Sequence, residues 1–412
     1  MNIEEWTERL CTAEVTAELG KLHFADTLAS FLVGLKTSEG SETSLIISDP
    51  NMYEGAVTGQ AAVARLSECD NIHLGSCVTP GCVATLVAPL YAQGDDSLYG
   101  AIAASYAAGI ALGRGIGGTK ALASGIWPTL FAAPTMAAIA ASRARKLTPK
   151  RVAHAIALAL AQSDGRTNFP PSRRWESFAH AVARGIHASD KAANGTQGDL
   201  GLLTPEWLVA KAGHPEVAMD AFEAISRVAE TGFKPFPIAR QGLNAVTAFQ
   251  NILSSGIEAE QIDSVDVFVP PANVALLTRP VSGELRLTRL CNMGFQLACA
   301  GLAPEKLYDA ERAATPPLMA FAARVSVHSD KTLETHLPNR WPARIVVKAG
   351  KRTAEETLVQ SDLDADAPDL KAALERKWAR LIPEAATEDC GVLGGVFRQY
   401  AERVSMLGAS EG

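Results

Sequence analysis

The chain has 412 residues, 47% of them hydrophobic, and a formal net charge of −7 at pH 7. This length exceeds the size at which a single core usually stops growing, so we expect two domains. The acidic balance excludes nucleic acid and anionic membrane surfaces as partners, because either requires a basic face. Acidic residues near the N-terminus, with no apolar segment after them, argue against a secretory signal and predict a cytoplasmic protein.

Two apolar segments, 97–113 and 121–142, are long enough to raise the question of membrane spans. They are rich in Ala and Gly and are interrupted by polar residues or Pro, which favours buried helices of a soluble protein. The seven cysteines are odd in number and scattered, which argues against a disulfide framework. They also lack the paired spacing of a zinc site, so we expect no metal.

The first 225 residues predict an all-helical region. Residues 3–36 predict two helices, because their apolar positions recur at helical spacing. Residues 37–55 predict a loop around a short strand-like segment, SLIIS. Further along, small-residue helices alternate with short polar interruptions, and a Thr-Pro-Gly turn at 79–81 precedes two long apolar helices.

The pattern changes after Gly232. Residues 241–254 and 292–303 predict helices, whereas the segments SVDVFVP, FAARVSVHSD, ARIVVKAG and KRTAEETLVQSD predict strands. Helices and strands segregated in this way indicate a small α+β domain. The tail from Asp369 to Leu407 returns to a helical pattern, and we expect it to pack on the first domain.

Several segments, in this order along the chain, resemble the MmgE/PrpD family of 2-methylcitrate dehydratases, cis-aconitate decarboxylases and iminodisuccinate epimerases. They are TPGCVATLVAPLYA with AIAASYAAGIALGRGIG after it, GIWPTLFAAPTMAAIAASRARKL, AHAVARGIHASDKAANG, KPFPIARQGLNAV, RVSVHSD and ARIVVKAG. The resemblance implies a mainly α fold with an α+β lid and an active site in the cleft between the two domains. It also implies a homodimer that uses neither a metal nor an organic cofactor. We expect 1–232 and 361–412 to form the all-helical domain and 233–360 the lid domain.

The chain departs from the family pattern at the positions that carry chemistry. The catalytic histidine of the family's HPG turn falls on Thr79, and the histidine of its F-H-P-T helix falls on Trp127. The lysine before its G-x-A-A helix falls on Arg174. Its acidic D-x-D-D-T segment is represented by Asp70, and the threonine there becomes His73. The resemblance therefore predicts a retained scaffold with much of the chemistry replaced.

His73 and Asp70 are the candidate acid and base. The family reactions begin with a proton on a carbon next to a carboxylate, which requires a base near the operating pH. His73 lies in a polar segment that predicts a loop rather than core, and its ordinary pKa suits proton transfer. Asp70 is a candidate to orient His73 or to act as the base, with a turn cap as the structural alternative. Thr79 is a candidate to hydrogen-bond a substrate oxygen.

Cationic side chains are the candidate carboxylate-binding groups, because a planar guanidinium holds a carboxylate with two parallel hydrogen bonds. Arg166 and Arg174 lie on a polar segment that the family uses at its cleft. Trp127 stands at a family site position and is a further candidate substrate-binding residue. Lys234 and Arg240 lie at the entry to the second domain. Solvated loop charges are the alternative interpretation of these cations.

The glycines at 113, 115 and 118 match the letters of a dinucleotide fingerprint. No strand precedes them and a helix ends there, so we expect a helix stop rather than an NAD site. Together these features indicate a cofactor-independent lyase that acts on a small di- or tricarboxylic acid by proton abstraction and loss of water. An isomerase, epimerase or decarboxylase in the same cleft stays open, as does a catalytically silent binding or partner subunit.

Overall fold

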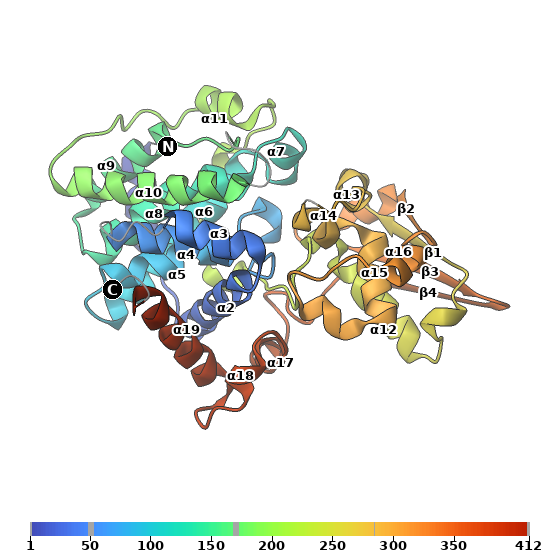
Figure 1. Ribbon diagram of the computed structural model, residues 1–412. Coiled ribbons are helices and arrows are strands. Elements are labelled where there is room, and N and C mark those ends of the chain that lie inside the picture. Colours follow the sequence, from blue (N-terminus) through green and yellow to red (C-terminus); the bar gives the residue numbers. More distant parts are fainter. Residues whose placement is uncertain (1, 48–52, 168–172, 284, 410–412) are drawn as a thin grey trace. The chain divides into compact units, whose positions relative to one another are not determined.

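The computed structural model describes residues 2–47, 53–167, 173–283 and 285–409. Its contacts divide the chain into two compact units (Figure 1). Unit 1 comprises Met1–Phe233 with Ile382–Gly412, and unit 2 comprises Lys234–Leu381. Unit 1 is built from helices, and unit 2 combines helices with a four-stranded sheet. The expected mainly α fold with a smaller α+β domain is confirmed.

Helices account for nearly all regular structure in unit 1. The α-helices that the structure describes there are α1 (Ile3–Leu10), α2 (Ala17–Leu35), α3 (Ser38–Ile47), α4 (Tyr53–Leu66), α5 (Gly81–Val87), α6 (Asp95–Gly115), α7 (Thr119–Ala123), α8 (Pro128–Ala144), α9 (Pro149–Ala161), α10 (Arg174–Ala193), α11 (Pro205–Ala212), α18 (Pro383–Ala386) and α19 (Gly391–Ala409). The two helices predicted within 3–36 are α1 and α2. Helix α6 ends at Gly115, as predicted from the glycine spacing.

The loop predicted for 37–55 is wrong over most of its described length. Helix α3 begins at Ser38, and the Thr37 hydroxyl accepts a hydrogen bond from the Gly40 amide at 3.0 Å, as an N-cap residue does. The first four residues of SLIIS lie inside α3, which packs against α2 and α4. Tertiary packing therefore overrides the β propensity of this segment. Residues 48–52 lie outside the described part of the chain.

Small residues allow the helices of unit 1 to approach closely. Helix α8 packs against α6, α9 and α10 (Figure 1). At Gly185 on α10, a Cβ atom would lie 2.1 Å from the carbonyl oxygen of Pro134 on α8. The Ala- and Gly-rich sequence thus reflects helix-to-helix packing at short distance. Within the described ranges, no helix is long and apolar enough to cross a membrane.

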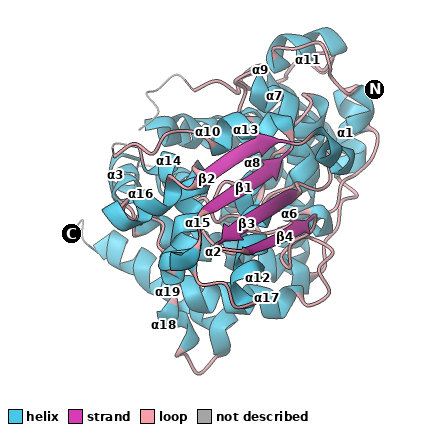
Figure 2. Ribbon diagram, turned by 90° about the vertical axis from the view of Figure 1, so that its right-hand side faces the viewer, coloured by secondary structure: helices cyan, strands magenta, loops and turns pink. Residues whose placement is uncertain are grey.

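Unit 2 contains all four predicted strands. They are β1 (Ser264–Val269), β2 (Val325–Ser329), β3 (Ala343–Ala349) and β4 (Arg352–Leu358). The sheet order is β2-β1-β3-β4, with β1 and β2 parallel and the other two pairs antiparallel (Figure 2). The helices of this unit are α12 (Leu243–Ser254), α13 (Pro271–Leu277), α14 (Arg286–Cys291), α15 (Met293–Leu302), α16 (Pro316–Ala322) and α17 (Leu370–Leu381).

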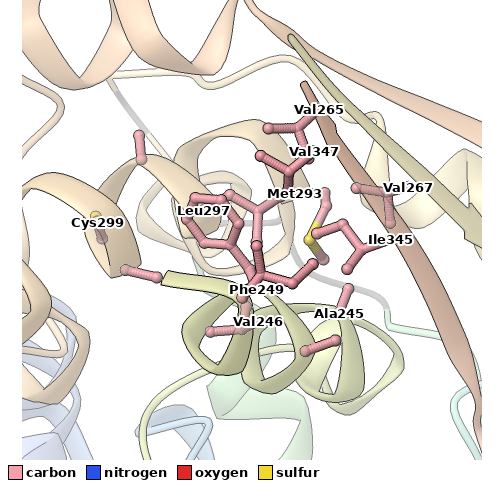
Figure 3. Packing of buried hydrophobic residues seen from close by; sticks show 14 of the residues in the cluster. Ala245, Val246, Phe249, Val265, Val267, Met293, Leu297, Cys299, Ile345 and Val347 are labelled. Carbon is pink, nitrogen blue, oxygen red and sulfur yellow. The ribbon is translucent and has the colours of Figure 1, made fainter. Parts of the chain in front are cut away.

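One face of the sheet forms the core of unit 2. Buried and partly exposed residues alternate along β1 and β3, as expected for strands with one covered face. On the covered face, Val265 and Val347 lie opposite each other and pack near Phe249 of α12 and Leu297 of α15 (Figure 3). The apolar alternation that predicted the strands is therefore the pattern of this core.

The predicted helical tail falls into both units. Helix α17 groups with unit 2, whereas α18 and α19 group with unit 1. On α19, Phe397 packs edge to face against Phe24 of α2, with ring centroids 5.5 Å apart. The sequence predicts 361–412 in the helical domain, but by their contacts residues 361–381 group with unit 2.

Candidate functional site

The segment between α4 and α5 carries three of the predicted site residues, and all three are buried. Asp70 is 0%, Thr79 1% and His73 4% exposed. The expectation that His73 lies on an open polar loop is wrong. Its Nδ1 atom accepts a hydrogen bond from the Ser76 amide inside the fold, so polar residues in this segment form buried hydrogen bonds rather than contacts with solvent.

The surroundings of His73 hold its ring neutral. Nδ1 accepts a hydrogen bond from the Ser76 amide at 3.1 Å, and Nε2 lies 3.3 Å from Arg114 Nη2 and 3.9 Å from Glu230 Oε2. Burial, and then the charge of Arg114, lowers the pKa of His73 to about 3. The ring nitrogens of His73 face Ser76 and Arg114 rather than Asp70. At neutral pH, His73 is therefore an uncharged and weak base.

Asp70 instead forms a buried ion pair with Arg65, at the end of α4. Arg65 Nη1 lies 3.4 Å from Asp70 Oδ1 and 3.2 Å from Glu68 Oε1. Burial alone lowers the pKa of Arg65, but the charges of Asp70 and Glu68 outweigh burial and raise it above its ordinary value. Arg65 is therefore a permanent cation held between two acids.

Arg174 reaches the carboxylate of Glu68 from another helix. It is the first residue of α10, not a loop residue, and its Nη2 atom lies 3.2 Å from Glu68 Oε1. Both guanidinium groups lie against the same two indole rings. Arg65 is 5.4 Å from the ring centroid of Trp127 and 5.8 Å from that of Trp175, and Arg174 is 5.2 and 4.1 Å away. We use the name two-arginine cluster for five residues: Arg65, Glu68, Trp127, Arg174 and Trp175.

The Thr79 turn is attached to the helix that begins beside Trp127. The Thr79 amide donates to Thr129 Oγ1 at 3.2 Å, and the two hydroxyls are 3.3 Å apart. Thr129 lies in the first turn of α8, for which Trp127 is the N-cap residue. Asp70 pairs with Arg65, and both Arg65 and Arg174 lie over the Trp127 ring. Three positions identified from the family pattern, Asp70, Trp127 and Arg174, are therefore linked through Arg65.

The other predicted cations are Arg166, Lys234 and Arg240. Arg166 is exposed on the loop after α9. Lys234 and Arg240 belong to unit 2, where Lys234 is buried and Arg240 pairs with buried Asp364 at 2.5 Å. Within the described ranges, no group of three His, Cys, Asp or Glu side chains is placed to hold a metal ion.

Sequence reasoning missed Arg65 and Glu68. Their spacing of three residues across the end of α4 was the available signal, since it places two opposite charges near each other. That spacing is common on solvated helix faces, so it does not identify a site. Only the contact with Arg174 does so.

A chain of hydrogen bonds with defined donors and acceptors anchors the segment between α4 and α5 to the interior of unit 1. The Gly81 amide donates to Asn71 Oδ1 at 3.1 Å, which assigns the amide nitrogen of Asn71 as the donor to the Tyr106 hydroxyl at 3.3 Å. That hydroxyl then donates to His23 Nδ1 at 3.1 Å. Burial lowers the pKa of His23 to about 3, so the ring is neutral and Nδ1 accepts. The chain links α2, α6 and the start of α5.

Replacing Tyr106 with Phe tests this chain. We expect the free energy of unfolding to fall by about 1–3 kcal/mol, because a buried donor of Asn71 and a buried acceptor of His23 both lose their partner. Urea unfolding of the two proteins measures the difference. The control is Tyr99→Phe on the same helix, whose hydroxyl takes no part in the chain. Equal effects of the two substitutions contradict the prediction.

Two domain models of one family match this chain. The MmgE/PrpD N-terminal domain matches residues 56–216, and the MmgE/PrpD C-terminal domain matches residues 236–390. A comparison with curated proteins found no match. The whole two-arginine cluster lies within the N-terminal match.

Proposed function

Because the chain belongs to the MmgE/PrpD family, we propose that it is a cofactor-independent lyase acting on a small di- or tricarboxylic acid. The proposed reaction is abstraction of a proton next to a carboxylate, followed by loss of water. Family membership by itself indicates a dehydratase-like lyase. The substrate class and the reaction are what the resemblance to this family implies, and the arrangement of residues in unit 1 supports them.

The observation that carries this proposal is the pair of guanidinium groups in the two-arginine cluster. Arg65 and Arg174 converge on one carboxylate oxygen, that of Glu68. Arginine pairs of this kind recognise carboxylates through charge-assisted hydrogen bonds. Proton abstraction beside a carboxylate also moves negative charge onto its oxygens, which fixed cations stabilise at the moment that it develops. The same two arginines would therefore bind the substrate and lower the barrier.

We assign proton transfer to the carboxylates rather than to a histidine. Asp70 is the proposed base, and Glu68 is the second carboxylate beside the same arginine. The lowered pKa of His73 leaves it a positioning role next to Arg114. Thr79 stays a proposed hydrogen-bond donor to a substrate oxygen, and Lys234 a proposed carboxylate-binding residue. Arg240, which pairs with Asp364, likewise stays a proposed carboxylate-binding residue.

Arg174→Met tests the carboxylate-binding role. We expect at least one di- or tricarboxylate in a panel to raise the melting temperature of the natural protein. In the Arg174→Met variant, we expect the affinity for that acid to fall at least about tenfold, since a charged hydrogen bond contributes about 1.5–3 kcal/mol. The exposed Arg166→Met variant is the control and should bind normally. The proposal fails if no acid raises the melting temperature, or if Arg174→Met binds as well as the natural protein.

Proton abstraction has a direct readout that does not depend on the later steps. Incubation of the protein with each binding acid in D2O should exchange the hydrogen next to the carboxylate, as proton NMR detects. Dehydration then produces a carbon–carbon double bond and decarboxylation releases carbon dioxide. Exchange without net loss of substrate indicates an isomerase or epimerase.

A second candidate function is a catalytically silent binding subunit. One set of observations favours it: Arg65 is balanced by two acids, the ring of His73 is buried, and Thr79 and Trp127 occupy the family's histidine positions. In that case a carboxylate would raise the melting temperature, while no acid in the panel would exchange its proton in D2O. The two experiments together thus separate a lyase from a binding subunit.

A further inference from the structure

Glu68 stands in the position that a bound carboxylate ligand would take. Its Oε1 atom lies 3.2 Å from Arg65 Nη1 and also 3.2 Å from Arg174 Nη2. A carboxylate oxygen shared by two guanidinium groups is a typical arrangement for a tightly held anion. The side chain of Arg174 is 22% exposed, so an external anion can reach the cluster at this residue.

Charge balance decides how such an anion can bind. Among the ion pairs of the described residues, Arg65 and Arg174 provide two positive charges, and Glu68 and the adjoining Asp70 provide two negative charges. An added carboxylate would leave excess negative charge in a largely buried cluster, which is costly where solvent screening is weak. A ligand carboxylate therefore has to replace one of the two acids. Asp70 is fully enclosed and pairs with Arg65, whereas Glu68 bridges both arginines.

The backbone of Glu68 gives independent support. Its φ angle is +58°, in the left-handed region, two residues after the end of α4. Glycine is the usual residue at this position of a helix end, because a Cβ atom is disfavoured there. Glu68 adopts this disfavoured conformation, and its carboxylate lies between two arginines.

We propose that Glu68 is an internal counter-ion, and that a substrate carboxylate binds the two-arginine cluster by displacing the Glu68 side chain. The displaced carboxylate remains on the same turn, next to the bound acid. The ligand class is a small acid with a carboxylate that fits between two guanidinium groups beside the indole rings. This inference rests on the proposed carboxylate-binding function of the cluster.

Calorimetric titration of the full chain with malonate tests the displacement. Removing the internal competitor with Glu68→Gln should make malonate bind at least about tenfold more tightly than in the natural protein, at equal ionic strength. The matched control is Glu176→Gln, which removes a carboxylate that pairs with Arg173 in the first turn of α10. It should leave the malonate affinity unchanged. Equal or weaker binding by Glu68→Gln, or no malonate binding by any folded variant, overturns the proposal.

Two further variants keep the test decisive. Glu68→Gly adopts the left-handed backbone without strain and replaces the Gln variant if that protein does not fold. Adding Arg174→Met to Glu68→Gln should abolish the gain in affinity, since one of the two guanidinium groups is lost. A gain that survives Arg174→Met shows malonate binding elsewhere and contradicts the displacement.

The outcome also separates this inference from the proposed lyase function. If Glu68→Gln gains malonate affinity but the natural protein exchanges no proton in D2O, the internal counter-ion is correct and the lyase proposal fails. If the natural protein turns over an acid but Glu68→Gln gains no malonate affinity, the lyase proposal is correct and the internal counter-ion proposal fails.

Discussion

Acidification from pH 6.5 towards pH 4 is expected to destabilise unit 1 steeply. Burial lowers the pKa of His23 to about 3, and burial together with Arg114 lowers that of His73 to about 3. In the unfolded chain both rings have a pKa near 6.5. At a pH between the folded and the unfolded pKa values, the unfolded chain binds protons on these rings that the folded chain does not bind. The two rings therefore impose no penalty above pH 6.5, and stability is lost progressively as the pH falls towards 3.

The size of this effect is comparable to the whole stability of a domain. Each histidine contributes about 1.4 kcal/mol per pH unit, so the two together give a slope of about 2–3 kcal/mol per pH unit. Over two pH units the loss reaches about 5 kcal/mol, which is the lower end of the usual free energy of unfolding. Urea unfolding at pH 7, 6, 5 and 4 measures the slope.

Substitutions assign the slope to the two rings. Asn keeps an acceptor near the position of Nδ1 and cannot take up a proton in this pH range. His23→Asn and His73→Asn should each remove about half of the slope, and the exposed His180→Asn should remove none. A urea midpoint that does not change between pH 7 and pH 4 contradicts the prediction.

Arg312→Met is expected to destabilise unit 2 by about 3–5 kcal/mol. The Arg312 side chain is 1% exposed and serves as a structural cation. Nη1 donates to the carbonyl oxygens of Leu307 at 3.1 Å and Asp309 at 2.9 Å. Nη2 donates to the carbonyl oxygen of Pro237 at 2.6 Å and to Gln296 Oε1 at 2.8 Å. These bonds connect the entry into unit 2 with α15 and the turn that follows it.

The expected loss is large because Met supplies no donor to any of these acceptors. Each buried acceptor left without a partner costs about 1–3 kcal/mol, and neighbouring losses are not fully additive. Arg312→Lys keeps the charge but has only three donors, so its loss should be intermediate. The exposed Arg352→Met is the control, with an expected change well under about 1 kcal/mol. Equal urea midpoints for Arg312→Met and Arg352→Met contradict the prediction.

The strands and most helices were predictable because their local patterns agree with their packing. The alternation in SVDVFVP corresponds to one covered and one open face of β1. Residues 38–47 were not predictable from such patterns. Their Ser, Gly and β-branched content disfavours a helix, and contacts with other helices, mainly α2 and α4, stabilise α3.

Part of the candidate site was likewise predictable from the sequence, and part was not. From the sequence alone, the order of the family segments identified Thr79, Trp127 and Arg174 as positions where this chain departs from the family pattern. The tertiary structure decided which groups meet. Arg65 and Glu68 at the end of α4 meet Arg174 on α10, although 106 residues separate Glu68 from Arg174.

The same division applies to the protonation of the site. The ordinary pKa of histidine suggested a base at His73, but its enclosure beside Arg114 makes the ring a weak one. Sequence patterns report the periodicity and propensity of a single element, and these determined the fold class of this chain. Ion pairing and burial depend on groups that distant elements bring together, so the charge partners of the site could be decided only in the folded chain.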